Sequence, residues 1–257
     1  MGGAMSKGPE GRIALVTGAG RGIGAATARW LARHGHRVAL GARTMSEVES
    51  VVREIEAEQG AGTSMALVLD VSDPKQVASA FDRIESQWGV VRVLVNNAAA
   101  LIRGEVASMP LEDFERTMAV NVRGSFVCAQ ELFRRIARPE ADKGTEAGAS
   151  ERGCIVNLSS LGGIRGTTKF PGLCAYTTSK HAVVGLTESL AVEGKRLGIR
   201  VNCVAPGAVA TRMLQEAAPF LKTSTRPEDI AEIIGYLCDP VRARSLNGAV
   251  IEVHSNE

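Results

Sequence analysis

The sequence predicts an α/β protein in which a seven-stranded parallel sheet is covered by helices on both faces, giving three layers in a single domain. The first reason is that short apolar runs alternate with longer helical patterns along nearly the whole chain. The second is that 257 residues, 45% of them hydrophobic, suit one large α/β domain. The third is that small and polar residues follow several apolar runs, and such positions meet at the carboxyl edge of a parallel sheet, where ligands bind.

Each apolar run is short enough for a strand and apolar throughout, as expected for strands that are buried on both faces. The predicted strands span residues 12–17, 37–41, 65–69, 90–95, 154–158, 199–204 and 249–253. Helices are expected between them. Asp73 and Pro74 have the pattern of an N-cap and a first helical residue, and residues 111–137 carry an apolar stripe at helical spacing.

Three segments differ from this alternation. Residues 1–10 predict a flexible tail ahead of a domain that spans 11–257. Residues 138–152 are polar, charged and glycine-containing, which predicts an exposed loop. Residues 211–224 combine several apolar side chains with few charges, which predicts a flap over a substrate site.

A glycine-rich turn directly follows the first predicted strand and opens the first helix. Its residues are Gly18, Gly20, Arg21, Gly22, Ile23 and Gly24, in the spacing TGxxxGxG. Glycines at such a turn let backbone N–H groups approach a pyrophosphate, which the helix N-terminus also attracts. The turn therefore indicates a Rossmann-type, doubly wound dinucleotide-binding fold; the alternative is a glycine turn that binds nothing.

The second predicted strand ends without the acid that NAD-binding sites place there to hold the ribose 2′-hydroxyl. Arg43 and Thr44 follow this strand, and the first acid is Glu47. Arg21 adds a second positive charge inside the glycine turn. Because arginine accommodates a 2′-phosphate, the sequence predicts NADP(H) rather than NAD(H). The alternative is a pair of solvated arginines, since arginine is usually exposed.

Other residues at the carboxyl edge are expected to contact the same dinucleotide. An acid after the third strand is suited either to accept a hydrogen bond from an adenine amino group or to cap the next helix; the cap pattern at Asp73 and Pro74 leaves Asp70 freer for a ligand. Small residues after the fourth strand allow the backbone to approach a ligand closely. The expected contacts are Asp70, Val71, Asn97, Ala98, Ala99, Pro206, Gly207, Val209 and Thr211.

Tyr176 and Lys180 are four residues apart on a predicted helix and therefore share one face. A free phenol has a pKa of about 10, and a nearby ammonium lowers that value. Ser160, after the fifth strand, is suited to steady the oxygen of a reacting carbonyl. Asn121 lies inside a predicted helix, where asparagine is unfavourable, so it is either part of a polar relay or locally hydrogen-bonded. The tyrosine and lysine alone are more typical of an exposed helix.

Composition argues against several other classes of protein. Thirty basic and 28 acidic residues leave a net charge of +2, which shows no footprint for nucleic acid or a membrane surface. The apolar runs are too short to span a membrane, and residues 1–10 lack the apolar core of a signal peptide. The five cysteines have no CxxC spacing and the four histidines do not cluster with acids. We therefore expect reduced thiols, no metal site and a cytoplasmic location.

Taken in order, these motifs resemble the short-chain dehydrogenase/reductase family over residues 11–253, and are similar to its 3-oxoacyl-(acyl-carrier-protein) reductases. The matching motifs are TGAGRGIG, Asp70-Val71, VNNAA, Asn121, Ser160, YTTSK and Pro206-Gly207. The resemblance implies a hydride transfer with NADPH that interconverts a ketone or 3-oxoacyl carbonyl and a secondary alcohol. It also implies a small-molecule substrate, with acyl thioesters among the candidates, and a homotetramer or homodimer.

The resemblance further implies a role for each member of the catalytic set. Tyr176 would exchange a proton with the carbonyl, and Lys180 would lower the pKa of that phenol and hold the nicotinamide ribose, so both would also contact the cofactor. Ser160 would orient the carbonyl. Asn121 would hold a water that links Lys180 to solvent.

The chain departs from the family pattern in two places. Ala99 stands where the family usually has glycine, and the spacing from Ser160 to Tyr176 is a few residues longer than in many members. Arg165 and Lys169 fall in this longer segment; they are either solvated charges or attract an anionic substrate. The expected substrate pocket is apolar, with Leu101, Ile102, Leu161 and Met213.

Two other functions are consistent with the same fold, because fold does not determine function. One is epimerase or dehydratase chemistry with a bound cofactor, although such members often belong to longer, two-lobed relatives. The other is a non-catalytic NADP(H) sensor or scaffold. The complete set of asparagine, serine, tyrosine and lysine favours catalysis over the sensor or scaffold, since a site without catalytic function need not keep all four.

Overall fold

A computed structural model describes residues 12–139 and 151–254 of the chain. The predicted tail at 1–10 and most of the predicted loop at 138–152 lie outside the described residues. No helix in the described part of the chain is long and apolar enough to cross a bilayer. All five cysteines are free thiols, as expected; four are buried and Cys174 is exposed.

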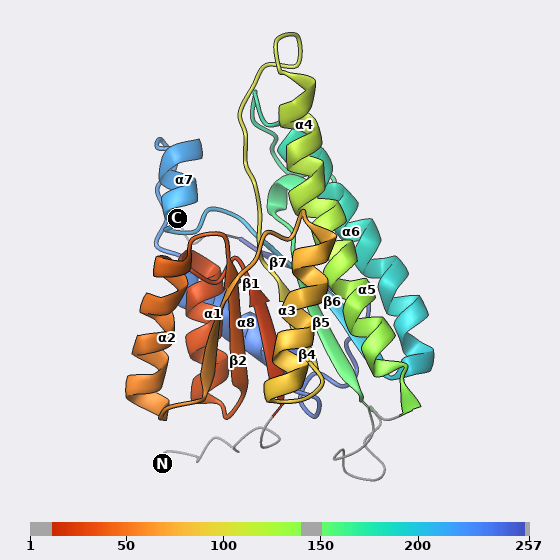
Figure 1. The fold of residues 1–257 in the computed structure, drawn as a ribbon. Coiled ribbons are helices and arrows are strands. Elements are labelled where there is room, and N and C mark those ends of the chain that lie inside the picture. The colour runs from red at the N-terminus through yellow and green to blue at the C-terminus, as the bar shows by residue number, and fades with distance from the viewer. Residues whose placement is uncertain (1–11, 140–150, 255–257) are drawn as a thin grey trace, which may run out of the picture.

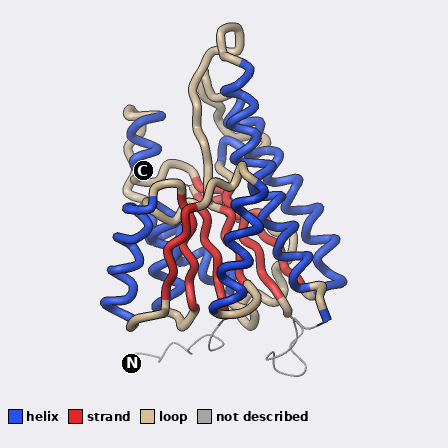
Figure 2. Tube along the Cα trace, viewed as in Figure 1, coloured by secondary structure: helices blue, strands red, loops and turns tan. Residues whose placement is uncertain are grey.

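The structure confirms the predicted three-layer architecture around one parallel sheet (Figure 1, Figure 2). The strands are β1 (Ile13–Thr17), β2 (Arg37–Ala42), β3 (Ser64–Val68), β4 (Val93–Asn96), β5 (Gly153–Leu158), β6 (Ile199–Pro206) and β7 (Val250–Val253). Their order in the sheet is β3-β2-β1-β4-β5-β6-β7, and every neighbouring pair is parallel. Successive strands are thus added on one side of β1 as far as β3 and on its other side from β4 onwards. The strand order reverses between β1 and β4, which is where ligands bind in doubly wound folds.

Helices cover both faces of the sheet. One face carries α1 (Gly22–Arg33), α2 (Met45–Gln59) and α8 (Pro227–Cys238). The other carries α3 (Pro74–Gln87), α5 (Gly124–Ile136) and α6 (Cys174–Gly194). Two further helices, α4 (Leu111–Met118) and α7 (Arg212–Ala217), rise beyond the carboxyl edge of the strands, at the top of Figure 1.

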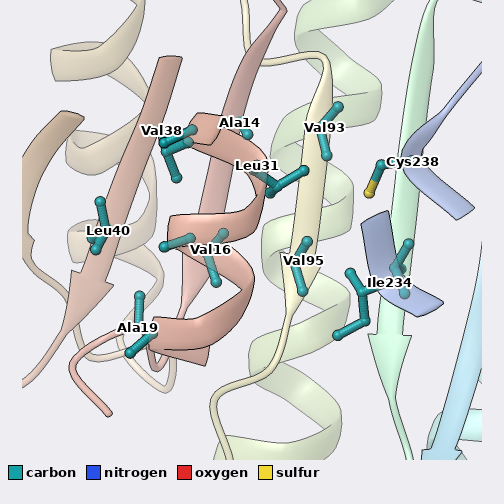
Figure 3. Close-up of a cluster of buried hydrophobic side chains, with 14 of the residues drawn as sticks. Ala14, Val16, Ala19, Leu31, Val38, Leu40, Val93, Val95, Ile234 and Cys238 are labelled. Carbon is teal, nitrogen blue, oxygen red and sulfur yellow. The ribbon is translucent and has the colours of Figure 1, made fainter. Parts of the chain in front are cut away.

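The alternation of side chains along β1 explains why the whole strand is apolar. Val16 packs into the core beneath α1 together with Leu40 and Val95, with which it is in register (Figure 3). Its neighbour Leu15 points to the opposite core, on the face covered by α3 and α5. Both side chains are fully buried. A strand buried on both faces needs apolar residues at every position, which is the pattern that predicted it.

The helical stretch predicted at 111–137 forms, but it is not a uniform α-helix. A π-helical turn, η1 (Ala119–Arg123), connects α4 to α5, and the Gly124 N–H donates to the Ala119 carbonyl.

The predicted cap of α3 is confirmed, because the Asp73 side chain accepts from the Lys75 N–H at 2.9 Å and Pro74 begins the helix.

Candidate functional site

A cleft of about 730 Å³ opens at the carboxyl edge of the sheet, between the loops that follow the strands. It brings together most of the residues predicted to contact a dinucleotide. Those that line it are Gly18, Gly20, Arg21, Gly22, Ile23, Arg43, Thr44, Asp70, Val71, Asn97, Ala98, Ala99, Tyr176, Lys180, Pro206 and Thr211. Gly24, Gly207 and Val209 were predicted too but do not line it.

The glycine turn leaves no room for side chains at two of its positions. A Cβ on Gly18, where φ is +64°, would lie 2.8 Å from the Ala98 Cα. A Cβ on Gly24 would lie 2.4 Å from the Gly18 carbonyl oxygen, so this glycine serves packing within the turn. The close packing places the start of α1 beside the cleft, and the first N–H groups of a helix have no partner within it, an arrangement that fits the pyrophosphate of a dinucleotide.

Asn97 holds the loop after β4 against this turn. Its amide nitrogen donates to the carbonyls of Thr17 and Gly18 at 2.9 and 3.0 Å. The Thr17 hydroxyl in turn accepts from the N–H groups of Asn97 and Ala98, both at 3.1 Å. The Asn97 side chain therefore shapes the cleft wall through the backbone, in addition to lining the cleft.

Four charged groups predicted or noted from the sequence line the part of the cleft expected to receive the nucleotide, called here its nucleotide end. Arg21 and Arg43 are exposed and line it, as does Glu47, which stands in the first turn of α2. Asp70 also lines the cleft, and one of its oxygens accepts from the N–H and hydroxyl of Ser72. Because Asp73 caps α3, the structure excludes the capping role for Asp70.

Tyr176 and Lys180 lie on one face of α6, as their spacing predicted. The Lys180 amine is 5.6 Å from the centre of the Tyr176 ring and donates to the Leu158 carbonyl at 2.7 Å. Ser159, which the sequence analysis did not single out, donates to the Lys180 carbonyl at 2.8 Å and fixes the helix to the end of β5. The Ser160 hydroxyl accepts from the Gly162 N–H at 3.2 Å.

Burial governs the titration of both groups. It raises the pKa of Tyr176 to about 12, although hydrogen bonding with Ser160 acts in the opposite direction. Burial also lowers the pKa of Lys180 from 10.5 to about 8. This differs from the expectation that Lys180 lowers the pKa of the phenol: the amine is hydrogen-bonded to Leu158, and loss of water around the phenol is the larger effect.

Asn121 lies in the π turn and is buried, and its side chain is hydrogen-bonded within the protein. Its oxygen accepts from the Ala100 N–H at 2.7 Å, and its nitrogen donates to the Ala100 carbonyl at 2.9 Å and to the Ser179 hydroxyl at 2.8 Å. Asn121 therefore joins the loop after β4 to α6. These partners are distant in the sequence, so the contacts differ from the local hydrogen bonding expected as the alternative; the water relay stays a prediction.

The other end of the cleft is partly apolar. Leu101, Ile102 and Met213 line it as predicted, whereas Leu161 does not. Neither Arg165 nor Lys169 lines the cleft either; the Lys169 amine is hydrogen-bonded within its own loop, 2.6 Å from the Thr167 hydroxyl.

Arg103 was missed by the sequence analysis, although it connects three loops over the cleft. Its guanidinium donates to the Ala217 carbonyl of α7 at 2.6 Å and to the Pro171 carbonyl at 3.3 Å. An edge-on contact between Phe170 and Phe220, with ring centres 6.1 Å apart, joins two of the same loops. Residues that act through backbone carbonyls leave no pattern of residue types, so no signal in the sequence identified Arg103.

The chain is similar to known proteins over most of its length. Residues 12–222 match the family described as short chain dehydrogenase. A 3-alpha-(or 20-beta)-hydroxysteroid dehydrogenase of Mycobacterium bovis is 35% identical over 237 residues, which cover 92% of this chain and 80% of that protein. A 3-oxoacyl-(acyl-carrier-protein) reductase of Staphylococcus aureus is 32% identical over 254 residues, which cover 95% and 96% of the two chains.

Solved structures resemble the whole fold. The 3-ketoacyl-(acyl-carrier-protein) reductase of Brucella melitensis, solved in complex with NADH, superposes with a TM-score of 0.83 at 31% identity and covers 95% of this chain and 97% of its own. A levodione reductase superposes with a TM-score of 0.82 at 28% identity, covering 94% and 95%.

Proposed function

Since this chain belongs to the short-chain dehydrogenase family of nicotinamide-dependent oxidoreductases, we propose that it interconverts a carbonyl and a secondary alcohol with NADP(H) and uses Tyr176 as the acid and base. The observation that carries the proposal is the position of Tyr176. Tyr176 is half-buried at the wall of a dinucleotide-sized cleft, on the same helix face as the Lys180 amine.

The residues around the cleft fit a dinucleotide. The glycine turn and the start of α1 would hold the pyrophosphate, and Arg21 and Arg43 would hold a 2′-phosphate. When bound, the nicotinamide supplies or accepts the hydride. The preference for NADP(H) rests on the two arginines and on the absence of an acid directly after β2.

The raised pKa of Tyr176 suits the reduction of a carbonyl. With a pKa of about 12 the phenol is protonated at neutral pH, so it is able to give its proton to the carbonyl oxygen. Ser160 adds a hydroxyl beside the phenol. Lys180, with a pKa of about 8, is largely charged at neutral pH, and its amine lies 5.6 Å from the centre of the Tyr176 ring.

The substrate proposed is a small ketone or a 3-oxoacyl thioester. The cleft wall formed by Leu101, Ile102 and Met213 suits an apolar chain, and one relative is named for reducing a 3-oxoacyl carrier protein. We also propose a cytoplasmic homotetramer or homodimer assembled through the helices that carry Asn121 and Tyr176. An apolar groove there, which includes Phe114, Met118 and the 44%-exposed Phe126, supports this assembly.

The test is to follow NADPH oxidation with a panel of ketones, aldehydes and 3-oxoacyl thioesters, for the wild type and for Tyr176→Phe. Loss of a general acid should lower kcat/KM by about 10²- to 10⁴-fold while the affinity for NADPH stays unchanged. Tyr236→Phe is the matched control. Tyr236 is the second of the two tyrosines; it lies on α8, does not line the cleft, and its hydroxyl donates to the Arg242 carbonyl.

Each other outcome has a definite meaning. Equal activity in the two variants would remove Tyr176 from the mechanism. Tight NADPH binding without turnover of any panel member would favour the sensor function. Absence of NADPH binding would overturn the cofactor assignment built on Arg21 and Arg43.

A further inference from the structure

Glu47 lies at the nucleotide end of the cleft and is not explained by the proposed cofactor preference. It is an acid in a region where two exposed arginines, Arg21 and Arg43, favour a phosphate. It is placed there by α2, because it occupies the first turn of that helix, which begins at Met45 after Arg43 and Thr44.

The Glu47 side chain packs against the glycine turn itself. Its carboxylate lies 3.5 Å from the Arg21 guanidinium, and both side chains are partly exposed. A Cβ on Gly20 would lie 2.9 Å from the Glu47 Cβ and 3.0 Å from a carboxylate oxygen. Glu47 therefore occupies the space above Gly20, next to the arginine expected to receive a 2′-phosphate.

The same carboxylate also acts on the flap helix α7. Arg212 lies in the cleft wall and forms an ion pair with Glu216 at 2.6 Å. The pKa of the Arg212 guanidinium is raised first by Glu216, and the charge of Glu47 adds to this effect. Glu47 thus pairs with the cation on the glycine turn and shares the cleft wall with a second cation, Arg212 of α7.

We propose that Glu47 is a specificity-determining residue that holds Arg21 and opposes a 2′-phosphate, and so restricts the preference of this protein for NADP(H) over NAD(H). A phosphate that binds Arg21 has to share that guanidinium with a carboxylate of like charge, which is unfavourable. A ribose 2′-hydroxyl is neutral and meets no such repulsion. This inference rests on the proposed dinucleotide-binding function and concerns the choice between the two dinucleotides.

The experiment compares the dissociation constants of NADPH and NADH, measured by calorimetry on the full chain, for the wild type and Glu47→Gln. Removing the charge should tighten NADPH binding by about threefold to tenfold and change NADH binding by less than about twofold. The gain should shrink as salt is added, because the repulsion is partly exposed to solvent. Glu47→Ala should give the same result, since it also removes the charge.

Glu49→Gln is the matched control, because Glu49 is an exposed acid of the same helix outside the cleft wall and its loss changes the net charge equally. It should leave both constants unchanged. An unaltered ratio of the two constants in Glu47→Gln overturns the inference, and so does weaker NADH binding, which would make Glu47 a ribose ligand. If the wild type binds neither dinucleotide, the proposed function itself fails.

Discussion

Lys180 has one of the least favourable positions in the molecule for a charged residue. Its side chain is almost fully buried, and its amine donates to the Leu158 carbonyl. Burial lowers its pKa from 10.5 to about 8, so at pH 7 the folded protein holds an ammonium that water would solvate better. Such a cost is typical of groups retained for function rather than for stability.

We therefore expect Lys180→Met to stabilise the fold at pH 7 by about 1 kcal/mol while it abolishes turnover. The folded pKa lies below the unfolded one, so between pH 8 and 10.5 the unfolded chain binds more protons and wild-type stability rises with pH. The advantage of the variant should shrink over that range. Urea unfolding at pH 7 and pH 9.5 measures both effects, and parallel pH dependence of the two proteins would show that Lys180 does not contribute this term.

At the scale of elements, the loop after β5 and helix α6 meet at Gly163. A Cβ there would lie 2.5 and 2.6 Å from the carbonyl carbon and oxygen of Lys180, and 2.6 Å from the Ser159 hydroxyl. Two of these three atoms are backbone, so relief requires the helix itself to move. The close approach made possible by this glycine therefore sets the distance between β5 and the tyrosine helix.

Gly163→Ala should destabilise the protein by about 1–3 kcal/mol and lower kcat/KM, because it displaces the Tyr176 helix from the cleft. Gly185→Ala is the matched control. Gly185 lies in α6 itself, is exposed, and has nothing within 4 Å of the position that a Cβ would take. That change should stabilise the helix by about 0.5–1 kcal/mol. Thermal unfolding and steady-state kinetics measure the stability and the kcat/KM of both variants. If Gly163→Ala changed these two quantities no more than Gly185→Ala does, α6 would be able to move away from Gly163 without loss of stability or activity.

At the scale of the whole molecule, the two edges of the sheet have different tasks. The carboxyl edge holds the cleft, whereas the amino edge holds a buried ionic cluster. There Glu151 binds Arg12 at 2.9 Å and also Arg200, and each of the three side chains is at most 12% exposed. His36 lies at the same edge, buried in the turn between α1 and β2, and burial together with the Arg12 guanidinium lowers its pKa from 6.5 to about 4.

His36 should make the fold sensitive to acid. Its folded pKa is below its unfolded one, so between pH 6.5 and 4 the unfolded chain binds more protons and stability falls as the pH falls. His36→Leu should remove about 2–3 kcal/mol of that loss, whereas replacement of the exposed His181 by Gln should not. Denaturant unfolding at pH 6.5 and pH 4.5 gives the comparison; an unchanged slope in His36→Leu would assign the acid sensitivity to other groups.

The strands and the glycine turn could be predicted from the sequence because their causes are local. A strand such as β1 is apolar at every position, and Gly18 stands where the backbone needs a positive φ. The raised pKa of Tyr176 could not be predicted, because it depends on burial by distant segments. The π turn at Asn121 could not be predicted either. The same holds for the contacts of the Arg103 and Glu47 side chains with Ala217 and Arg21, because the path of the loops and the pitch of the helices decide which groups these side chains reach.

The crossover from β3 back to β4 divides the polypeptide at about its first third. The charged groups at the nucleotide end, Arg21, Arg43 and Glu47, all precede it, and Ser160, Tyr176 and Lys180 all follow it. The proposed choice of dinucleotide and the proposed handling of the carbonyl are thus encoded in consecutive, separate stretches. A single recombination between the two stretches would combine the cofactor of one parent gene with the reaction of another, so the two properties are free to be inherited independently.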